Sequence, residues 1–394
     1  MMSKKVYAAL MVPVNDMPLP FICAAIGAVV ANMIYALGYL KGFYEQKQLL
    51  KISPQSLTEP LWICIPARNE IDRLPKTIDH LLQNKDSNFK IFVVDDQSTD
   101  GTTDWLTHRA QKDPRLKCIN NKSKIPGKPG ALAHLIRHLE ANESQHPRAY
   151  LFLDADMQLD TQIFGALQHE LYNGPYQALS GAPQLICKSL SEHLIVPAVA
   201  ALAAVLYPPS QVHEGKKCFL NGQFIFIKRS LLTKIGGWES VAHEVLEDVA
   251  LAQHIKDHGE RVGLIDLRPY LATRMYTSFG EVIAGFSKNI LPLTGGSLSA
   301  FFWGFLGILL THAPILFVGL ALFWKKAVGW ALLSWLFTSL CQGLTRKLWG
   351  QSMGFAFLSP LTALGLMIII VNSIFHTLSQ QPLNWRGRDI QLKK

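Results

Sequence analysis

The sequence predicts an α/β domain with a parallel sheet, set between membrane-embedded segments near both ends of the chain. Short apolar runs alternate with helical periodicities between residues 60 and 160, which is typical of a parallel sheet. Long uncharged stretches lie outside this region. Charged residues make up 17% of the chain, against roughly 25% in soluble proteins. Hydrophobic residues make up 49%, which excludes a disordered chain.

Residues 1–40 are predicted to form an N-terminal membrane anchor. Leu19–Leu40 contains no charged residue and is 22 residues long, against about 20 needed to span a bilayer. A cleaved signal peptide is the competing interpretation. Its apolar core is only about 7–15 residues long and a small-x-small cleavage site follows it, whereas this stretch is longer and no clear site follows.

Residues 298–394 are predicted to form a C-terminal membrane bundle of about three helices that ends in a basic tail. The apolar stretches are Leu298–Trp324, Ala327–Leu344 and Met353–Leu378, and the tail contains Trp385-Arg386-Gly387-Arg388. We therefore expect an integral protein of the plasma (inner) membrane.

Charge does not settle the membrane topology. Lys41, Lys47 and Lys51 follow the anchor, and the positive-inside rule then places the domain of residues 41–297 in the cytoplasm. If 298–324 is a single span, the basic tail ends outside. If it is a re-entrant hairpin broken at residues 311–314, the tail returns inside, but Arg346 and Lys347 face outward.

The alternating elements of the domain can be placed individually. The predicted strands are Leu61–Pro66, Ile91–Val94, Leu116–Ile119 and Tyr150–Leu153. The predicted helices are Ile71–Leu82, Thr102–Arg109 and Ala131–Glu140, with a flexible loop over 127–130 before the last one. Ligands of such sheets bind outside the carboxyl ends of the strands. Acidic residues follow two of these strands: Asp95 and Asp96, then Asp154 and Asp156.

Asp154 and Asp156 lie two residues apart, so both carboxylates point the same way in extended backbone. Two such carboxylates form a partial site for Mg²⁺ or Mn²⁺. An Asp-rich turn is the alternative. Lys128 lacks the surroundings of a Walker loop, but its side chain can reach a diphosphate as a point charge.

Glu247 and Asp248 open a helical pattern. Acids in a first helical turn complement the helix dipole. The functional interpretation is a general base that deprotonates an acceptor hydroxyl.

At Asp95 and Asp96, a carboxylate can accept hydrogen bonds from a base or ribose, while Thr99 or Asp100 caps the following helix.

Five ordered motifs between residues 60 and 290 resemble family 2 glycosyltransferases. They are Ile65-Pro66-Ala67-Arg68-Asn69-Glu70, Val94-Asp95-Asp96-Gln97-Ser98-Thr99-Asp100-Gly101-Thr102, Asp154-Ala155-Asp156, Gly236-Gly237-Trp238 and Glu247-Asp248. The resemblance implies a GT-A fold, a nucleotide-sugar donor such as a UDP-hexose, a divalent metal (Mg²⁺ or Mn²⁺) and inversion at the anomeric carbon.

The resemblance also implies roles for individual residues. Those expected around the donor are Pro66, Arg68, Glu70, Asp95, Asp96, Lys128 and Asp154, with the base contact left open between Asp95 and Asp96. Asp156 would be the main metal ligand, with Asp154 near ribose or metal. Asp248 would be the catalytic base, with Glu247 beside it. No Gln-x-x-Arg-Trp motif of processive synthases follows Asp248, which favours transfer of a single sugar.

Further segments resemble the membrane glycosyltransferases of carotenoid and hopanoid pathways, which glycosylate a polyisoprenoid acceptor. They are Asn221–Phe224, Glu244–Leu251, Thr273–Tyr276, Gly285–Asn289 and Trp385–Arg388. Gln223, Arg274 and Lys288 in these segments are candidates for contact with acceptor or diphosphate. Polyprenyl-phosphate and glycerolipid glycosyltransferases share much of the pattern and remain the alternative.

The residues themselves also favour a lipid acceptor. Phe279, Val282, Ile283, Phe286 and Ile290 lie on one helical face, so residues 279–291 can form an interfacial helix or an ordinary core-facing one. Leu194–Tyr207 is uncharged but too short to span a bilayer. The pI of about 9.2 is better explained by anionic lipid than by nucleic acid. A non-catalytic sensor would need a broken motif, and a transporter would need more ionisable residues in its spans than His312.

Overall fold

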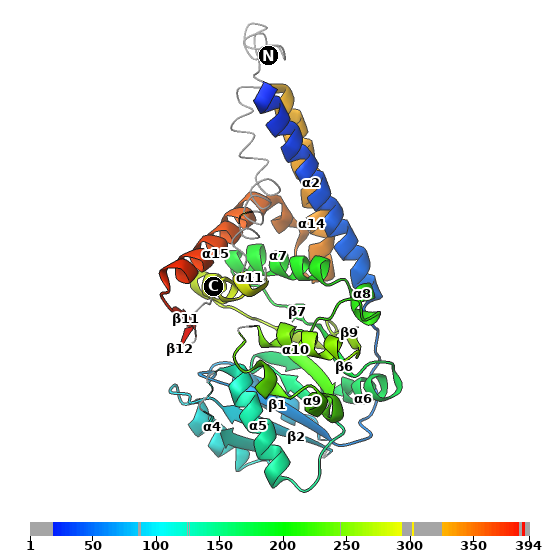
Figure 1. Ribbon diagram of the computed structural model, residues 1–394, viewed down its shortest axis with the longest axis vertical. Coiled ribbons are helices and arrows are strands. Elements are labelled where there is room, and N and C mark those ends of the chain that lie inside the picture. Colours follow the sequence, from blue (N-terminus) through cyan, green and yellow to red (C-terminus); the bar gives the residue numbers. More distant parts are fainter. Residues whose placement is uncertain are drawn as a thin grey trace.

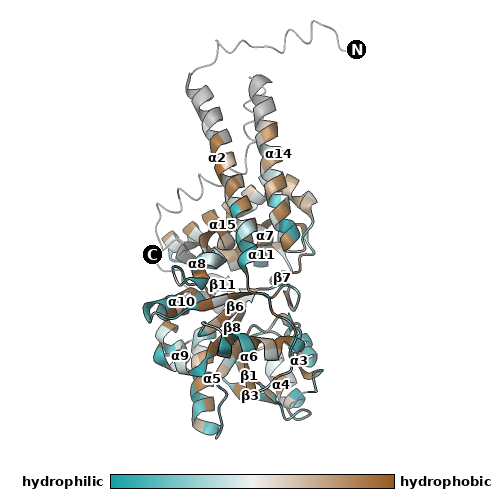
Figure 2. Ribbon diagram, turned by 90° about the vertical axis from the view of Figure 1, so that its right-hand side faces the viewer, coloured by the Kyte–Doolittle hydropathy of each residue, from teal (hydrophilic) through white to brown (hydrophobic). Residues whose placement is uncertain are grey.

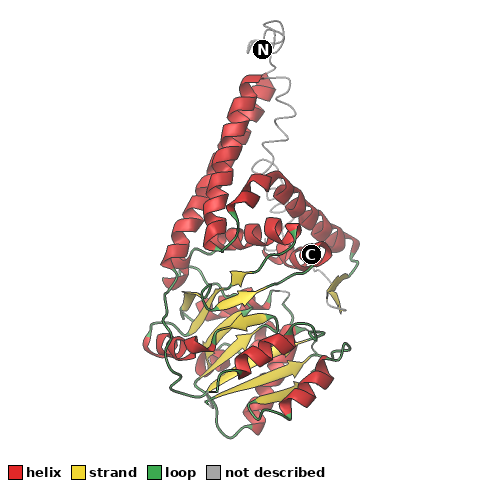
Figure 3. Ribbon diagram, turned by 180° about the vertical axis from the view of Figure 1, so that it is seen from behind, coloured by secondary structure: helices red, strands yellow, loops and turns green. Residues whose placement is uncertain are grey.

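The protein has a sheet domain at one end and long helices at the other, with shorter helices between them (Figure 1). The structure is a computed structural model and describes residues 19–85, 88–123, 125, 127–244, 246–293, 302, 325–385 and 388–390. Helices cover both faces of the sheet in the domain, whereas the described residues at the opposite end form long helices (Figure 3).

Among the described residues, seven strands form the central sheet in the order β3-β2-β1-β4-β8-β6-β9. Their bounds are β1 Leu61–Ala67, β2 Phe89–Asp95, β3 Leu116–Asn120, β4 Ala149–Leu153, β6 Ala178–Ala182, β8 Phe224–Lys228 and β9 Val262–Asp266. The four predicted strands are present and mutually parallel. The sheet as a whole is mixed, because β8 runs antiparallel to β4 and β6. Phe224, the first residue of β8, therefore pairs with Leu153, the last residue of β4.

The central strands are buried on both faces, which explains their continuous apolar runs. Alternate residues of β1 enter different cores: Ile63 and Ile65 lie in one, Trp62 and Cys64 in the other. Helices α3 (Leu74–Leu82), α4 (Thr102–Ala110) and α6 (Phe164–Asn173) contribute to the first core. Helices α5 (Lys128–Asn142), α9 (Arg229–Lys234) and α10 (Glu247–Asp257) contribute to the second.

Helix α5 begins at Lys128, three residues earlier than predicted. Gly127 precedes it with φ 92°, and Pro129 lies in the first turn, where its fixed φ suits a helix and its missing N–H costs nothing. The predicted flexible loop over 127–130 is therefore wrong. Lys128 projects from the start of a helix instead.

Short elements connect the sheet domain to the helical end. Among the described residues, β5 (Met157–Leu159), β10 (Leu271–Thr273) and β7 (Gln184–Leu185) form a small sheet. The other short elements are η2 Gln46–Gln48, η3 Thr161–Ile163, α8 Pro209–His213, η4 Trp238–Val241, β11 Leu383–Trp385 and β12 Arg388–Ile390. Between this region and the long helices lie α7 (Leu190–Leu206) and α11 (Phe279–Leu293), as Figure 1 shows.

The long helices are α2 (Leu19–Glu45), α14 (Lys325–Leu348) and α15 (Ser359–Ser379), the last preceded by η5 (Met353–Leu358). Helices α2 and α14 lie side by side (Figures 1 and 2). Large apolar side chains face outward from α14 and α15, including Leu333, Leu340, Leu364, Val371 and Phe375. In Figure 2, hydrophobic residues (brown) are frequent along α2 and α15, whereas hydrophilic residues (teal) are frequent on helices of the sheet domain such as α10.

Within the described part of the chain, one helical stretch is long and apolar enough to cross a membrane: Met353–Ser379. The predicted anchor is a helix over Leu19–Glu45, and the predicted interfacial helix is α11. The number of spans remains a prediction. Apart from Phe302, the stretch 298–324, whose course decides between a span and a hairpin, lies outside the described residues, as do Arg386 and Gly387.

Candidate active site

The predicted site residues meet at one edge of the central sheet. The carboxyl ends of β1, β2 and β4 lie there, because these strands are parallel. The segment that leads into β8 reaches the same edge from the opposite direction, so Gln223 lies beside Asp154. The Asp154 N–H donates to the Gln223 carbonyl at 3.1 Å. This edge brings Asp95, Asp96, Asp154 and Asp156 together with segments from the second half of the chain.

Asp95 and Asp96 have different partners, although both are almost completely buried. Asp95 Oδ2 accepts from the Ser98 N–H at 3.3 Å and from Thr103 Oγ1 at 2.8 Å, at the start of α4. Asp96 Oδ1 accepts from Asn121 Nδ2 at 2.7 Å. Asp95 therefore organises its own loop, whereas Asp96 faces the end of β3.

The other residues predicted around the nucleoside surround this pair. Pro66 is the penultimate residue of β1. Arg68 donates from Nη1 to the Asp96 carbonyl at 2.6 Å and to the Gln97 carbonyl at 3.2 Å. The buried Glu70 donates its N–H to Thr102 Oγ1 at 3.0 Å. These contacts tie the loop after β1 to the loop after β2.

Lys128 connects the acidic groups of the site. Its Nζ lies 2.7 Å from Asp154 Oδ1, 2.6 Å from the Gly222 carbonyl oxygen and 3.7 Å from Glu247 Oε1. Burial acts to lower the pKa of Lys128, but the charges of Asp154 and Glu247 outweigh it and raise that pKa. Lys128 therefore stays protonated between the end of β4 and the start of α10.

Asp248 lies at the start of α10, as the sequence predicts. Its Oδ2 accepts from the Gly222 N–H at 2.9 Å, and its Oδ1 accepts from the Val249 N–H at 2.9 Å. Burial and the neighbouring charge of Glu247 raise the pKa of Asp248 to about 6, against the opposing charge of Lys128. A carboxylate with such a pKa is ionised at neutral pH and still a useful proton acceptor.

Asp156 follows Asp154 in the same acidic segment. Burial and the charge of Asp154 raise the pKa of Asp156, while Arg73 and Lys128 oppose the rise. A cation between the two carboxylates would relieve this repulsion, and hard oxygen ligands suit Mg²⁺ and Mn²⁺ equally. The described residues contain no cluster of three or more His, Cys, Asp or Glu arranged for a metal. The pair therefore fits a cation whose remaining ligands are phosphate oxygens and water.

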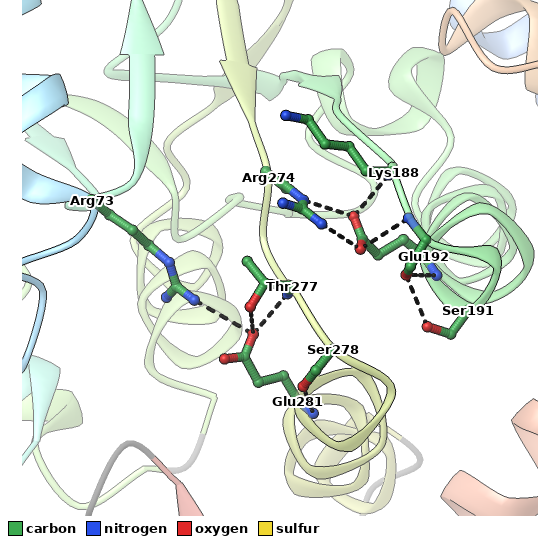
Figure 4. A network of polar contacts seen from close by, with 9 residues as sticks. Arg73, Lys188, Ser191, Glu192, Arg274, Thr277, Ser278 and Glu281 are labelled. Atoms are coloured by element: carbon green, nitrogen blue, oxygen red, sulfur yellow. Dashed lines mark hydrogen bonds and ion pairs between the residues drawn. The ribbon is translucent and has the colours of Figure 1, made fainter.

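Two ion pairs connect the site with α7 and α11, the helices between the sheet domain and the long helices (Figure 4). Arg274 donates to both carboxylate oxygens of Glu192, at 3.0 and 2.9 Å, and Glu192 also closes the capping box of α7 with Ser189. Arg73 Nη2 lies 3.4 Å from Glu281 Oε2 in the first turn of α11. Lys288 lies further along α11. The structure thus gives Arg274 a buried carboxylate partner that the sequence did not reveal.

Comparison with known proteins identifies the chain. The model of glycosyl transferase family 2 matches residues 62–193, which include the strand-edge carboxylates, and that of glycosyl transferase family 21 matches residues 203–394. Residues 62–193 therefore match a family 2 glycosyltransferase domain, and the chain is a glycosyltransferase. It is 23% identical over 370 residues to a 4,4'-diaponeurosporenoate glycosyltransferase of Staphylococcus haemolyticus, covering 90% of this chain and 95% of that protein.

Two further proteins resemble this glycosyltransferase. An undecaprenyl-phosphate mannosyltransferase of Micrococcus luteus is 40% identical over 60 residues, 15% of this chain and 24% of that protein. The solved structure of a mannosyltransferase from Pyrobaculum calidifontis, in complex with GDP-Man and Mn²⁺, superposes with a TM-score of 0.55 and 18% identity. That match covers 91% of this chain and 99% of the other, and it supports the GT-A-like fold.

Several residues of this glycosyltransferase site could not be predicted from the sequence. Asn121, Arg73 and Glu192 carry no motif of their own, and their roles depend on partners far along the chain. Gly222 was visible only as part of the segment Asn221–Phe224. A glycine beside predicted site residues was the available signal, because close backbone approach often requires one.

Proposed function

We propose that the protein transfers a single sugar, with inversion, from a nucleotide sugar such as a UDP-hexose to a hydroxyl of a membrane lipid. The acceptor is a carotenoid or another polyisoprenoid, and transfer requires Mg²⁺ or Mn²⁺. The catalytic domain lies on the cytoplasmic side of the plasma membrane. The observation that supports this most is the arrangement of Asp154, Lys128, Gly222 and Asp248, which puts a partly buried base next to the strand-edge carboxylates.

The donor occupies the strand edge. Its nucleoside lies along Arg68, Glu70 and Asp96, and its diphosphate lies toward Asp154, Asp156 and Lys128. Asp156 and Asp154 would hold the metal, which would neutralise charge on the departing diphosphate. The solved structure of the Pyrobaculum calidifontis mannosyltransferase contains GDP-Man and Mn²⁺, which supports a nucleotide-sugar donor and a divalent metal on this fold.

The charges around Asp248 favour a neutral acceptor group. Among the described residues, Lys128 is the one lysine that is paired with Asp154 and Glu247, and its charge also acts on Asp248. The guanidinium of Arg274 is already paired with Glu192. A hydroxyl acceptor suits this excess of acid, because Asp248 must accept the hydroxyl proton as the oxygen attacks the anomeric carbon.

The acceptor reaches the site from the lipid. Helices α7 and α11 lie between the sheet domain and the long helices (Figure 1), and Phe279, Leu202 and Leu206 on them are exposed apolar side chains. Such a surface suits contact with the membrane interface. A polyprenyl-phosphate acceptor is the alternative, since the Micrococcus luteus relative is named for one.

The test compares Asp248→Asn with Asp257→Asn, the same substitution at an exposed aspartate on the same helix. Each purified enzyme is reconstituted with polyisoprenoid alcohols or polyprenyl phosphates and radiolabelled UDP-glucose. We expect Asp248→Asn to lower transfer to the alcohol about 100-fold or more and Asp257→Asn to leave it unchanged. Undiminished turnover of Asp248→Asn would refute the base, and transfer to phosphate alone would refute the hydroxyl acceptor.

A further inference from the structure

Gly222 lies between the two acidic halves of the site and contacts both through its backbone. Its N–H donates to Asp248 Oδ2 at 2.9 Å. Its carbonyl accepts from Lys128 Nζ at 2.6 Å, and the same ammonium holds Asp154 Oδ1 at 2.7 Å. One peptide segment therefore sets the spacing between the carboxylate on α10 and the carboxylate after β4.

No side chain fits at this position without a shift. A Cβ atom on Gly222 would lie 2.9 Å from Asp248 Oδ2, 3.3 Å from Asp248 Cγ and 3.3 Å from Lys128 Nζ. These contacts are shorter than ordinary van der Waals distances, and the atoms that would have to move are the carboxylate and the ammonium themselves. The absence of a side chain at residue 222 is therefore what permits the observed positions of both groups.

The turn that carries Gly222 is held from the neighbouring strand β6. Asn221 donates its N–H to Ser180 Oγ at 2.8 Å and its Nδ2 to the Gly181 carbonyl at 3.0 Å. Ser180 is completely buried and donates in turn to the Phe224 carbonyl at 2.8 Å. The backbone of Gly222 is thus fixed by the sheet, so an added methyl group would displace the side chains of the site rather than the turn.

We propose that Gly222, fixed by Asn221, is a positioning residue that aims the Asp248 carboxylate at the acceptor. This rests on the proposed role of Asp248 as the base. Gly222 acts through Asp248 and touches no substrate itself. A displacement of about 1 Å at a reacting group can lower turnover about 100-fold, so Gly222→Ala is expected to reduce kcat about 10- to 100-fold.

The decisive experiment is a double-mutant cycle with Asp248→Asn. If Gly222 works mainly by placing Asp248, most of the loss from Gly222→Ala will disappear in an enzyme that already lacks the base, so the double variant will lie close to Asp248→Asn. If Gly222→Ala merely damages the domain, the two losses will multiply. Gly354→Ala is the matched control, because its Cβ would lie 3.5 Å from Ser352 Oγ, an ordinary contact.

The outcomes separate this inference from the proposed function. Full activity of Asp248→Asn would overturn the base and the inference with it. An inactive Asp248→Asn beside a fully active Gly222→Ala, or multiplying losses in the double variant, would overturn the inference alone. Should Gly222→Ala fail to fold, Asn221→Ala enters the same cycle, because it releases the turn from Gly181 without adding atoms. Independent losses there would refute the proposal.

Discussion

Arg346 compensates for a proline in the middle of helix α7. Pro197 lies inside this helix and has no N–H, so the His193 carbonyl lacks its usual partner four residues on. Arg346, from the end of α14, donates to the carbonyls of His193 and Leu194, the latter at 3.2 Å. The guanidinium thereby joins α14 to α7. The side chain of Arg346 is only 4% exposed, so these bonds are made away from water.

The free energy that this contact contributes to stability follows from its two hydrogen bonds. Hydrogen bonds to a charged group contribute about 1.5–3 kcal/mol each, so Arg346→Met should destabilise the protein by about 3 kcal/mol. In a Pro197→Ala background, residue 197 regains an N–H for the His193 carbonyl. Only the bond to Leu194 is then lost, and the cost should fall to about 1.5 kcal/mol.

Thermal unfolding in detergent tests this prediction. The unfolding entropy of a 394-residue chain is about 0.8 kcal/mol/K, so the two losses correspond to about 4 °C and 2 °C in Tm. Lys347→Met, at the exposed neighbouring position, is the control and should leave Tm unchanged. Equal losses for Arg346→Met with and without Pro197 would refute the compensation.

Two further predictions concern charge. Because Asp248 must be ionised to act and its pKa is about 6, kcat/KM should fall about tenfold per pH unit below pH 6. Lys128→Met should move this acidic fall in kcat/KM to higher pH, because the charge of Lys128 lowers the pKa of Asp248. A kcat/KM that is constant from pH 5 to 7 would contradict the prediction. Burial acts to raise the pKa of Glu192, but hydrogen bonds from Arg274 and its cap outweigh it and lower that pKa from 4.5 to about 2. The ionised Glu192 therefore contributes about 3 kcal/mol to the free energy of unfolding above pH 4.5, and this contribution is lost as the pH falls toward 2. Glu192→Gln should lower the thermal unfolding midpoint at pH 7, and should lower it much less at pH 3. An equal decrease in the midpoint at both pH values would contradict this prediction.

The sequence was sufficient for the elements whose signal is local. The strands ending in Ala67 and Asp95 have continuous apolar runs because both of their faces are buried. Asp100 accepts from the Thr102 N–H at 3.0 Å at the start of α4, although the cap position itself is occupied by Gly101 and not by Thr99 or Asp100. The antiparallel strand β8 was not predicted, because the direction of a strand depends on its distant neighbours. The start of α5 was missed because Gly127 and Pro129 indicate a loop as readily as a helix start.

The site was predictable in its carboxylates but not in their partners. Asp154 and Asp248 follow recognisable patterns at a strand end and a helix start. That Lys128 and Gly222 join them depends on β8 entering the sheet beside β4, which no local pattern encodes. Charge pairs such as Arg274 with Glu192 likewise join residues 82 positions apart.

The central claim is metal-dependent transfer of one sugar to a membrane lipid, and an assay on membranes tests it most directly. Membranes with wild-type protein, Asp156→Ala or the exposed control Asp104→Ala are incubated with radiolabelled UDP-glucose, with and without EDTA. Extracted lipids are then separated and weighed by mass spectrometry. We expect a labelled lipid with one added hexose that is absent with EDTA and in Asp156→Ala, and present in the control. Label in insoluble polymer, or a labelled lipid unaffected by EDTA and by Asp156→Ala, would contradict it.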